Sequence, residues 1–271
     1  MPVTSATINN AHLSYELAGN GPAFVMVHGH LLDMHQWDNQ FEHFSQNYQV
    51  LRYDARGYGD STLPPEPFMH AADLHALLAE LAIERMILMG CSGGGQACID
   101  FALQYPHMIE RVILVGTAIT GFQPSGEISP VLLAMWEAEE RGATEEIIEH
   151  SLRVFTDGER RTPEQVNPAV RERTRAMTAK LYARTQVPEA EERGFEPNAV
   201  ARLEELGMPT LVVVGSEDTS LIQEIANLLV ARIPHAEKFV IADAAHHPNM
   251  EHPAEFNGIV RAFLERTTSS E

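Results

Sequence analysis

The chain is 271 residues long, and 38 acidic against 19 basic side chains give it a formal net charge of −19. This excess of acid excludes a general phosphate-tracking surface, because nucleic-acid binding depends on clustered Lys and Arg. It also argues against docking on anionic lipid, which needs polybasic segments. With 44 % hydrophobic and 21 % charged residues the composition is that of a globular protein. We therefore expect one large α/β domain, or one domain with a sizeable insertion.

The cysteines and the start of the chain bear on its compartment. Cys91 and Cys98 are too few for a disulfide framework and fit a reducing environment. The first ten residues have neither the basic nor the apolar region of a signal peptide, and no apolar run approaches the roughly 18 residues of a membrane helix. We expect a soluble, cytoplasmic protein with no nucleic-acid or membrane partner. The sequence does not determine whether it forms a homo-oligomer.

Short apolar runs alternate with longer amphipathic stretches, which is typical of βαβ units around a parallel sheet. The chain begins with an expected hairpin, in which strands over 3–8 and 12–17 are joined at Asn9-Asn10. The run over 23–27 is apolar throughout, as a strand buried on both faces should be. The next expected elements are a helix near 36–46, a strand over 49–53, a helix over 69–81, a strand over 86–89, a helix over 96–104 and a strand over 112–115.

The strand rhythm stops after residue 120 and resumes near residue 210. The intervening stretch is predicted to be mostly helical, and it carries six glutamates between 137 and 149. We expect a core domain made of 1–120 and 201–271, with 121–200 inserted as a helical cap. The expected elements of the last part are strands over 210–214 and 237–241 and helices near 220–232 and 253–265.

The strongest motif is Gly90-Cys91-Ser92-Gly93-Gly94, a G-x-S-x-G between an expected strand and an expected helix. That context is typical of a nucleophile elbow, a sharp turn that exposes the serine hydroxyl. A phosphate-binding loop is the alternative, but the Lys-Ser/Thr and the G-x-G-x-x-G spacing of such loops are missing. We predict Ser92 as a nucleophile, with the backbone N–H of Gly93 facing developing negative charge. The Cys91 thiol is expected to face the sheet and to be inert.

A serine nucleophile needs a base and an acid that orients the base, and in hydrolases of this topology the order is Ser, acid, His. Asp218 follows the expected strand over 210–214, and neighbouring Glu217 is the alternative acid. His246 is the predicted base. His247 is the alternative, although it precedes a proline and is therefore held extended; His252 lies further along, near the next helix start.

The segment His28-Gly29-His30 follows the first central strand. The N–H of His30 is predicted as the second oxyanion donor, while His28 is expected to be structural. A metal site made of His28, His30 and His35 lacks supporting ligand spacing, so we expect no metal. Leu31, Met135 and Trp136 are candidate pocket residues, although a Met or Trp stripe is as often packing. Asp54, Arg56 and Asp60 are expected to form a loop-stabilising ion pair and turn.

These residues carry a family resemblance. The chain resembles the α/β-hydrolase fold superfamily over nearly its whole length, through His28-Gly29, the loop over 53–61, Ser92, Tyr105-Pro106 before 111–116, Asp218, and His246-His247-Pro248 with 251–253. Its first half is similar to small carboxylesterases and 3-oxoadipate enol-lactonases, through residues 28–37 and 51–61. The resemblance implies a mostly parallel eight-stranded sheet with helices on both faces, a helical cap, a triad of Ser92, Asp218 and His246, and oxyanion donors His30 and Gly93. The chain departs from the family at Gly93, where relatives usually have Met or Gln, and at 243–245, where they have Gly-x-Gly.

The expected function is therefore a cofactor-free serine hydrolase that cleaves a small carboxylic ester or lactone through an acyl-enzyme on Ser92. One alternative is an acyltransferase or a cofactor-free perhydrolase of the haloperoxidase-like kind. Another is a hydrolase-fold protein that binds a ligand or signals. An acidic cap should slow anionic substrates, which favours neutral esters or lactones over dicarboxylate lactones.

Overall fold

An eight-stranded sheet runs through the centre of the computed structural model, which describes residues 3–184 and 190–266. The strand order is β1-β2-β4-β3-β5-β6-β7-β8. Strands β1 and β2 form the antiparallel hairpin, β2 is antiparallel to β4, and all later neighbours are parallel. The strands are β1 (Thr4–Ile8), β2 (Ala11–Ala18), β3 (Ala23–Val27), β4 (Gln49–Tyr53), β5 (Met86–Cys91), β6 (Ile109–Val115), β7 (Thr210–Gly215) and β8 (Ala236–Ile241).

The central strands are buried because their residues are apolar on both faces. Every residue of β5 and of β7 is buried, as the uninterrupted apolar runs predict. In the register of the sheet, Val27 at the end of β3 pairs with Tyr53 of β4 and with Gly90 of β5. The loops that follow these strands therefore leave the sheet at one common edge, where parallel α/β sheets build their sites.

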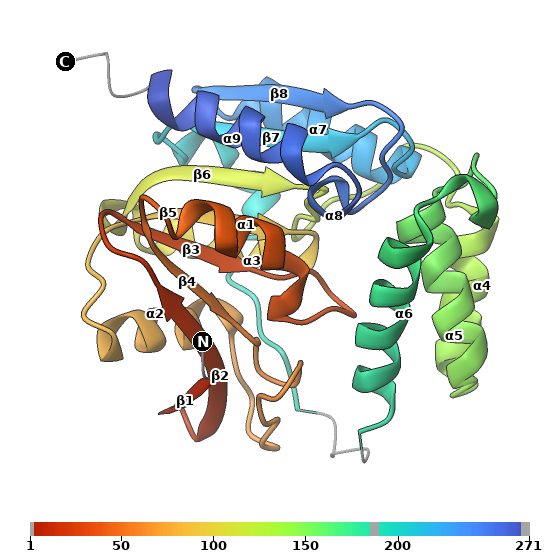
Figure 1. Ribbon diagram of the computed structural model, residues 1–271, viewed down its shortest axis with the longest axis horizontal. Helices are drawn as coiled ribbons and strands as arrows, with labels where there is room; N and C mark the ends of the chain where they lie inside the picture. Colours follow the sequence, from red (N-terminus) through yellow and green to blue (C-terminus); the bar gives the residue numbers. More distant parts are fainter. Residues whose placement is uncertain (1–2, 185–189, 267–271) are drawn as a thin grey trace.

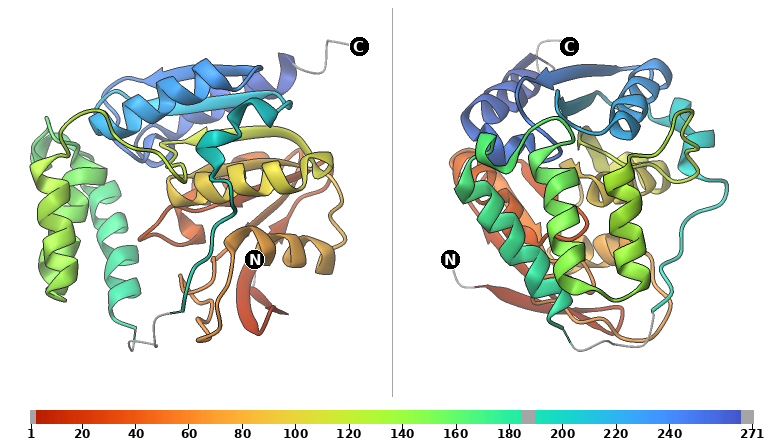
Figure 2. Two further views of the ribbon diagram at one scale, coloured as in Figure 1. Left: turned by 180° about the vertical axis from the view of Figure 1, so that it is seen from behind. Right: turned by 90° about the vertical axis from the view of Figure 1, so that its right-hand side faces the viewer.

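Two layers of helices cover the sheet, as Figures 1 and 2 show. The side chains of one layer pack around Leu74, Leu77 and Phe101, and those of the other pack around Phe24, Trp37 and Phe256. The predicted α/β fold, a mostly parallel eight-stranded sheet with helices on both faces, is thereby confirmed. The first layer holds α2 (His70–Glu80), α3 (Gly93–Gln104) and α7 (Ser220–Arg232); the second holds α1 (Asp38–Phe44), α8 (Pro248–Glu251) and α9 (Pro253–Arg266).

A further group of helices lies between β6 and β7 in the sequence and stands beside the carboxyl ends of the strands (Figure 1). We call α4 to α6 with the π-helix between them, residues 130–182, the inserted helices. Their apolar side chains, Leu132 and Met135 among them, pack against Leu31 of the core. The members are α4 (Pro130–Glu140), α5 (Thr144–Ser151), the π-helix Leu152–Asp157 and α6 (Pro168–Tyr182).

The structure shifts some expected boundaries. The helix expected near 36–46 is a 3-10 turn, Met34–Trp37, followed by α1, and the strand expected over 112–115 already begins at Ile109. Residues 185–189 of the segment expected to be mostly helical lie outside the described residues. No helix in the described ranges is long and apolar enough to cross a membrane. The other short 3-10 helices are Pro106–Met108, Pro163–Gln165, Ala199–Ala201 and Leu203–Glu205.

Candidate active site

Ser92 lies in the turn between β5 and α3 with φ 51° and ψ −121°, a strained conformation for a residue with a side chain. Backbone hydrogen bonds hold it there: its N–H donates to the Val115 carbonyl at 2.9 Å, and its own carbonyl accepts from Gln96 N at 3.0 Å. The flanking glycines allow the turn to close. A Cβ on Gly90 would lie 2.4 Å from the Gly94 carbonyl oxygen, and one on Gly94 would lie 2.2 Å from that of His28.

His246 and Asp218 form a buried pair at the same edge of the sheet. Nδ1 of His246 lies 2.9 Å from Oδ2 and 3.1 Å from Oδ1 of Asp218, and both side chains are almost wholly buried. Oδ1 also accepts the Thr219 N–H at 2.8 Å, which fixes the carboxylate. The other ring nitrogen of His246, Nε2, is buried and has no hydrogen-bond partner in the described part of the chain. When Nδ1 donates its hydrogen to Asp218, Nε2 is the ring atom whose lone pair can accept a proton.

Each alternative acid or base has other partners. Glu217 pairs with Arg160 at 2.9 Å, so its carboxylate is engaged away from His246. His247 is buried beside His246, with ring centroids 5.2 Å apart, and burial sets its pKa well below the usual value. His252 directs Nε2 towards the Asp243 carbonyl oxygen at 3.5 Å. Asp218 and His246 are the predicted acid and base that the structure brings together.

The backbones of His30 and Gly93 adjoin at the start of α3. A Cβ built on Gly93 would lie 3.8 Å from the His30 nitrogen. Leu31, directly after His30, has φ 68° and is buried against the inserted helices, so packing holds the strained turn that presents the His30 N–H. Two backbone N–H groups from adjoining segments, one of them at a helix N-terminus, are of the kind that binds a developing oxyanion.

Two cavities meet in front of Ser92. The first, the inner cavity, has a volume of about 270 Å³ and is lined by Ser92 and Gly93. The second, the outer cavity, has a volume of about 740 Å³ and reaches Tyr182 and Arg184 at the end of α6. Both share four lining residues, which therefore stand at their junction: His30, Tyr58, His70 and Glu192.

The three candidate pocket residues lie elsewhere. Leu31 and Met135 are buried in one apolar cluster, whereas Trp136 is 39 % exposed. As the cavities are defined by the described residues, none of the three lines either one. Sequence reasoning did not identify Tyr58, His70 and Glu192 as lining residues. Tyr58 lies in the loop over 53–61 that carries the family resemblance, but His70, at the start of α2, and Glu192, in a separate loop, belong to no motif.

The loop over 54–60 is stabilised by different pairs from those expected. Arg56 does not pair with Asp54; its Nε donates to Asp73 of α2 at 2.7 Å, in a pair that is almost fully buried. Asp54 instead accepts the N–H groups of Met34 and Asp60. With one N–H from its own loop and one from Met34, the Asp54 carboxylate joins this loop to the segment that follows β3.

The remaining polar groups near Ser92 are engaged or inert. His28 accepts the Ala55 N–H on Nε2 at 3.0 Å, and its Nδ1 lies 2.8 Å from the Gly29 carbonyl oxygen, which fits a structural role. The Cys91 thiol is buried, and burial raises its pKa to about 12. In the described ranges, no three His, Cys, Asp or Glu side chains are placed to hold a metal ion.

One contact from the inserted helices reaches the His246 backbone directly. The His246 N–H donates to the Phe155 carbonyl at 3.1 Å, and the two rings lie 4.9 Å apart. Arg161, just beyond the π-helix, donates to the Asp243 and Thr156 carbonyls and pairs with Glu251 at 2.8 Å. We call Phe155, Arg161 and Glu251 the clamp, because they hold the loop that carries His246.

The match of a family model to the sequence settles the class of protein. The model of the alpha/beta hydrolase fold matches residues 22–253, so the chain belongs to that family, and it is a hydrolase.

Particular relatives are similar over nearly the whole length. The chain is 26 % identical over 265 residues to 3-oxoadipate enol-lactonase 2 of Acinetobacter baylyi, with 96 % of each chain covered. Among solved structures, it superposes on Est816, described as an N-acyl homoserine lactone degrading enzyme, with a TM-score of 0.78 and 25 % identity over 96 % of this chain and all of that one. A thermophilic esterase from Thermogutta terrifontis gives a TM-score of 0.76 at 25 % identity, covering 98 % and 99 %.

Proposed function

We propose that this protein hydrolyses small carboxylic esters or lactones through an acyl-enzyme on Ser92. The observation that carries the proposal is the buried His246, whose Nδ1 is bound to Asp218 while Nε2 has no partner in the described residues. Nε2 is the atom that accepts a proton from a serine nucleophile. The likeness to an enol-lactonase, a lactone-degrading enzyme and an esterase supports the same chemistry.

The proposed reaction has two halves. Ser92 Oγ attacks the carbonyl carbon as its proton passes to Nε2 of His246, and Asp218 stabilises the imidazolium. The N–H groups of His30 and Gly93 stabilise the oxyanion. Nε2 then gives the proton to the leaving oxygen, the ester bond breaks, and the acyl group stays on Ser92. Water then gives a proton to Nε2 of His246 and attacks the acyl carbon. The bond between that carbon and Ser92 Oγ breaks, Oγ takes the proton from Nε2, and the acid is released.

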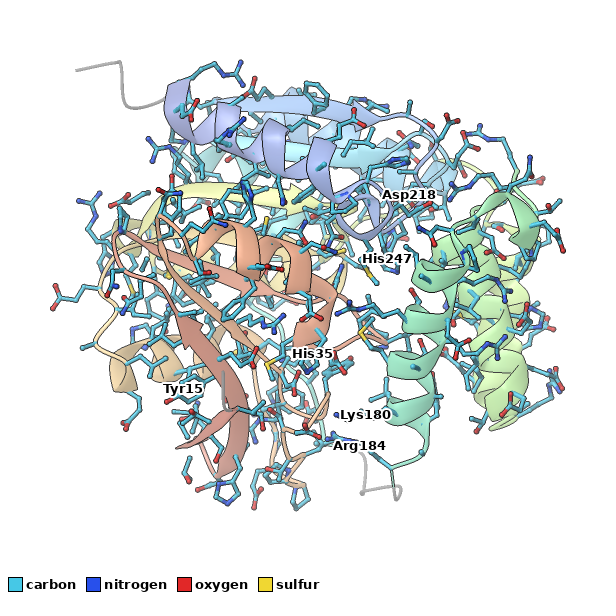
Figure 3. All side chains as sticks on the ribbon, viewed as in Figure 1. Tyr15, His35, Lys180, Arg184, Asp218 and His247 are labelled. Carbon is cyan, nitrogen blue, oxygen red and sulfur yellow. The ribbon has the colours of Figure 1, made fainter. Side chains whose placement is uncertain are left out.

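We also propose that residues 121–200 act as a cap over this site. The inserted helices stand beside the carboxyl ends of the strands, and the clamp joins them to the His246 loop. At the far end of α6, Lys180 pairs with Asp60 at 2.8 Å, and Arg184 donates to the Gly57 and Ser61 carbonyls. Figure 3 shows Asp218 and His247 towards one end of α6 and Lys180 and Arg184 at the other.

The test compares Ser92→Ala with the wild type on a panel of short acyl esters and lactones. We expect kcat/KM to fall by at least about 1,000-fold, because the oxyanion donors alone cannot replace covalent catalysis. A fluorophosphonate should label the wild type at Ser92 with a burst and leave Ser92→Ala unlabelled. Ser5→Ala, which changes an exposed serine of β1, is the matched control. Retained ester turnover by pure Ser92→Ala protein would refute the proposal.

A further inference from the structure

The inner cavity has an uneven charge. Its described lining includes Ser92, Gly93, Gln96 and three histidines, and Glu192 is the lining residue that carries a formal charge. The Glu192 side chain is 52 % exposed, and it lines the junction where the inner cavity opens into the outer one. A substrate held at Ser92 and extending outward therefore passes a carboxylate.

Partial burial raises the pKa of Glu192 above its usual value, and the two histidines beside it add no positive charge. His70 Nε2 is 3.7 Å away, but burial lowers the pKa of His70 to about 4, so this ring is neutral at pH 7. Burial also lowers the pKa of His30, whose Nδ1 is hydrogen-bonded to the Tyr58 hydroxyl.

The arginines of the outer cavity have other partners. Arg56 is held by Asp73 in a buried pair. Arg184 donates to the carbonyls of Gly57, Gly59 and Ser61. Neither arginine lines the inner cavity.

The backbone fixes where the Glu192 carboxylate can reach. Phe68 N donates to the Glu191 carbonyl at 3.0 Å, and Arg193 N donates to the Phe68 carbonyl at 2.8 Å. This short parallel bridge holds Glu192 against the segment that leads into α2. His70 Nε2 lies 3.7 Å from a Glu192 carboxylate oxygen. Tyr58, whose ring centroid is 6.4 Å from that of His70, lines the same junction. A carboxylate among aromatic rings is the environment that binds ammonium groups.

We infer that the site selects esters or lactones whose acyl or alcohol part carries a cationic nitrogen, which the Glu192 carboxylate binds at the junction of the two cavities. The inference rests on the proposed function, since it concerns the substrate of the same Ser92. It adds a chemical class to it: a quaternary or protonated amine on the part of the substrate that points away from the reacting carbonyl.

The experiment measures a ratio, so that any change common to all substrates cancels. On the alcohol side, the pair is acetylcholine and its neutral isostere 3,3-dimethylbutyl acetate. On the acyl side, it is the 4-nitrophenyl esters of 4-(trimethylammonio)butanoate and of 5,5-dimethylhexanoate. The quantity compared is kcat/KM for the cationic ester divided by kcat/KM for the neutral one, at low and at high salt.

For at least one pair we expect the wild-type ratio to be about 10 or more, the effect of one charged contact, and to fall with salt. Glu192→Gln should lower that ratio by about tenfold, and Glu192→Asp should lower it less. The matched control is Glu191→Gln, which removes the same charge one residue away from an exposed pair with Arg193. That control should leave the ratio within about twofold, because a general attraction of cations by the acidic protein would respond equally to both variants.

A wild-type ratio near one for both pairs, or a ratio that Glu192→Gln leaves unchanged, would overturn the inference while turnover of the neutral esters still supports the proposed function. Failure of the wild type to cleave any ester, neutral ones included, would instead count against the proposed function.

Discussion

The serine side and the histidine side of this site are held by different means. Ser92 is positioned by main chain: strand ends, backbone hydrogen bonds and glycines packed against carbonyl oxygens. His246 is positioned by the side chains of Asp218, Arg161 and Glu251 and by a main-chain hydrogen bond to Phe155. Glu251 completes the clamp by accepting the Ala245 N–H at 2.7 Å.

The difference shows why the serine side carries the stronger sequence motif. A turn made of tightly packed main chain tolerates few residue types, so its glycines recur at fixed spacing in a short segment. Side-chain contacts can come from anywhere in the chain: Phe155 and Arg161 lie in the inserted segment and Glu251 in α8. Mutation can test this difference. Disruption of the packed main chain on the serine side should lower the free energy of unfolding, and loss of a side-chain contact on the histidine side should lower kcat.

The largest effect is expected from Gly94→Ala. A Cβ at this position would lie 2.2 Å from the His28 carbonyl oxygen and 2.6 Å from that of Val27, and neither backbone atom can move without disturbing β3. We expect the free energy of unfolding to fall by about 3 kcal/mol or more, as in severe overpacking. Urea unfolding measures it. Gly126→Ala, where a Cβ meets nothing within 4 Å, should change stability by less than about 0.5 kcal/mol. Equal stability of the two variants would contradict the view that tightly packed main chain holds Ser92 in place.

A smaller effect, this time on rate, is expected from Arg161→Met. Without the guanidinium the Asp243 carbonyl and Glu251 lose their partner, so the loop carrying His246 is less well oriented. We expect kcat per folded molecule to fall about 10- to 100-fold with KM nearly unchanged, since orientation acts on the transition state.

Two further variants separate orientation from stability. Arg161→Met leaves the Glu251 carboxylate buried without its cation, which lowers stability; the double variant Arg161→Met/Glu251→Gln should recover stability but not kcat. Arg160→Met, which changes a neighbouring exposed arginine, should alter kcat by less than about twofold. If kcat returned together with stability in the double variant, the clamp would be only structural.

The smallest effect concerns the contact between α6 and the core. The hydrogen bond to Asp38 raises the pKa of His35, and Arg173 of α6 pairs with the same carboxylate. The protonated His35 is thus favoured in the folded state, so its stabilisation is fully present below the unfolded pKa of about 6.5 and is lost as pH rises through the folded value.

His35 is 40 % exposed, so solvent screening keeps this contribution below about 1 kcal/mol. Urea unfolding of His35→Gln should show a deficit against the wild type at pH 5.5 that disappears by pH 8.5. His235→Gln, at an exposed position, should show no pH-dependent deficit. A deficit that grew with pH would mean that the sign of the coupling is wrong.

The parts of the molecule that could be predicted from sequence share a physical origin. Apolar runs predicted the buried strands, and the order of Ser92, Asp218 and His246 after three strands predicted which side chains meet at one edge. The cavity lining could not be read in this way. Tyr58 and Glu192 are brought together by the path of two long loops, and a single sequence carries no periodic signal for such contacts.

The candidate pocket residues also show that sequence alone does not reveal which side chains line a cavity. Trp136 and Met135 are neighbours on α4, yet one is 39 % exposed and the other is 5 % exposed, because consecutive helical positions point about 100° apart. A stripe of large apolar residues indicates which residues face the core of a helical group, but not which of them reaches a cavity. One member of the acidic run has basic partners within the inserted helices. Glu149, in α5, forms ion pairs with Arg171 and Arg175 of α6, so part of the negative charge is neutralised within the inserted helices.

The hydrogen bond from the His246 N–H to the Phe155 carbonyl has a consequence for access to the site. If the inserted helices swung away as a rigid lid hinged at the Arg184 end, that bond would break. The imidazole of His246 would then lose its orientation with every turnover. If the inserted helices act as the proposed cap, opening that leaves the base undisturbed pivots about the Phe155–Arg161 end and frees the Arg184 end, whose hydrogen bonds to loop carbonyls can be exchanged for water. The outer cavity is lined by residues of that end, so under the same proposal it is the entrance, and Glu192 lies where it joins the inner cavity.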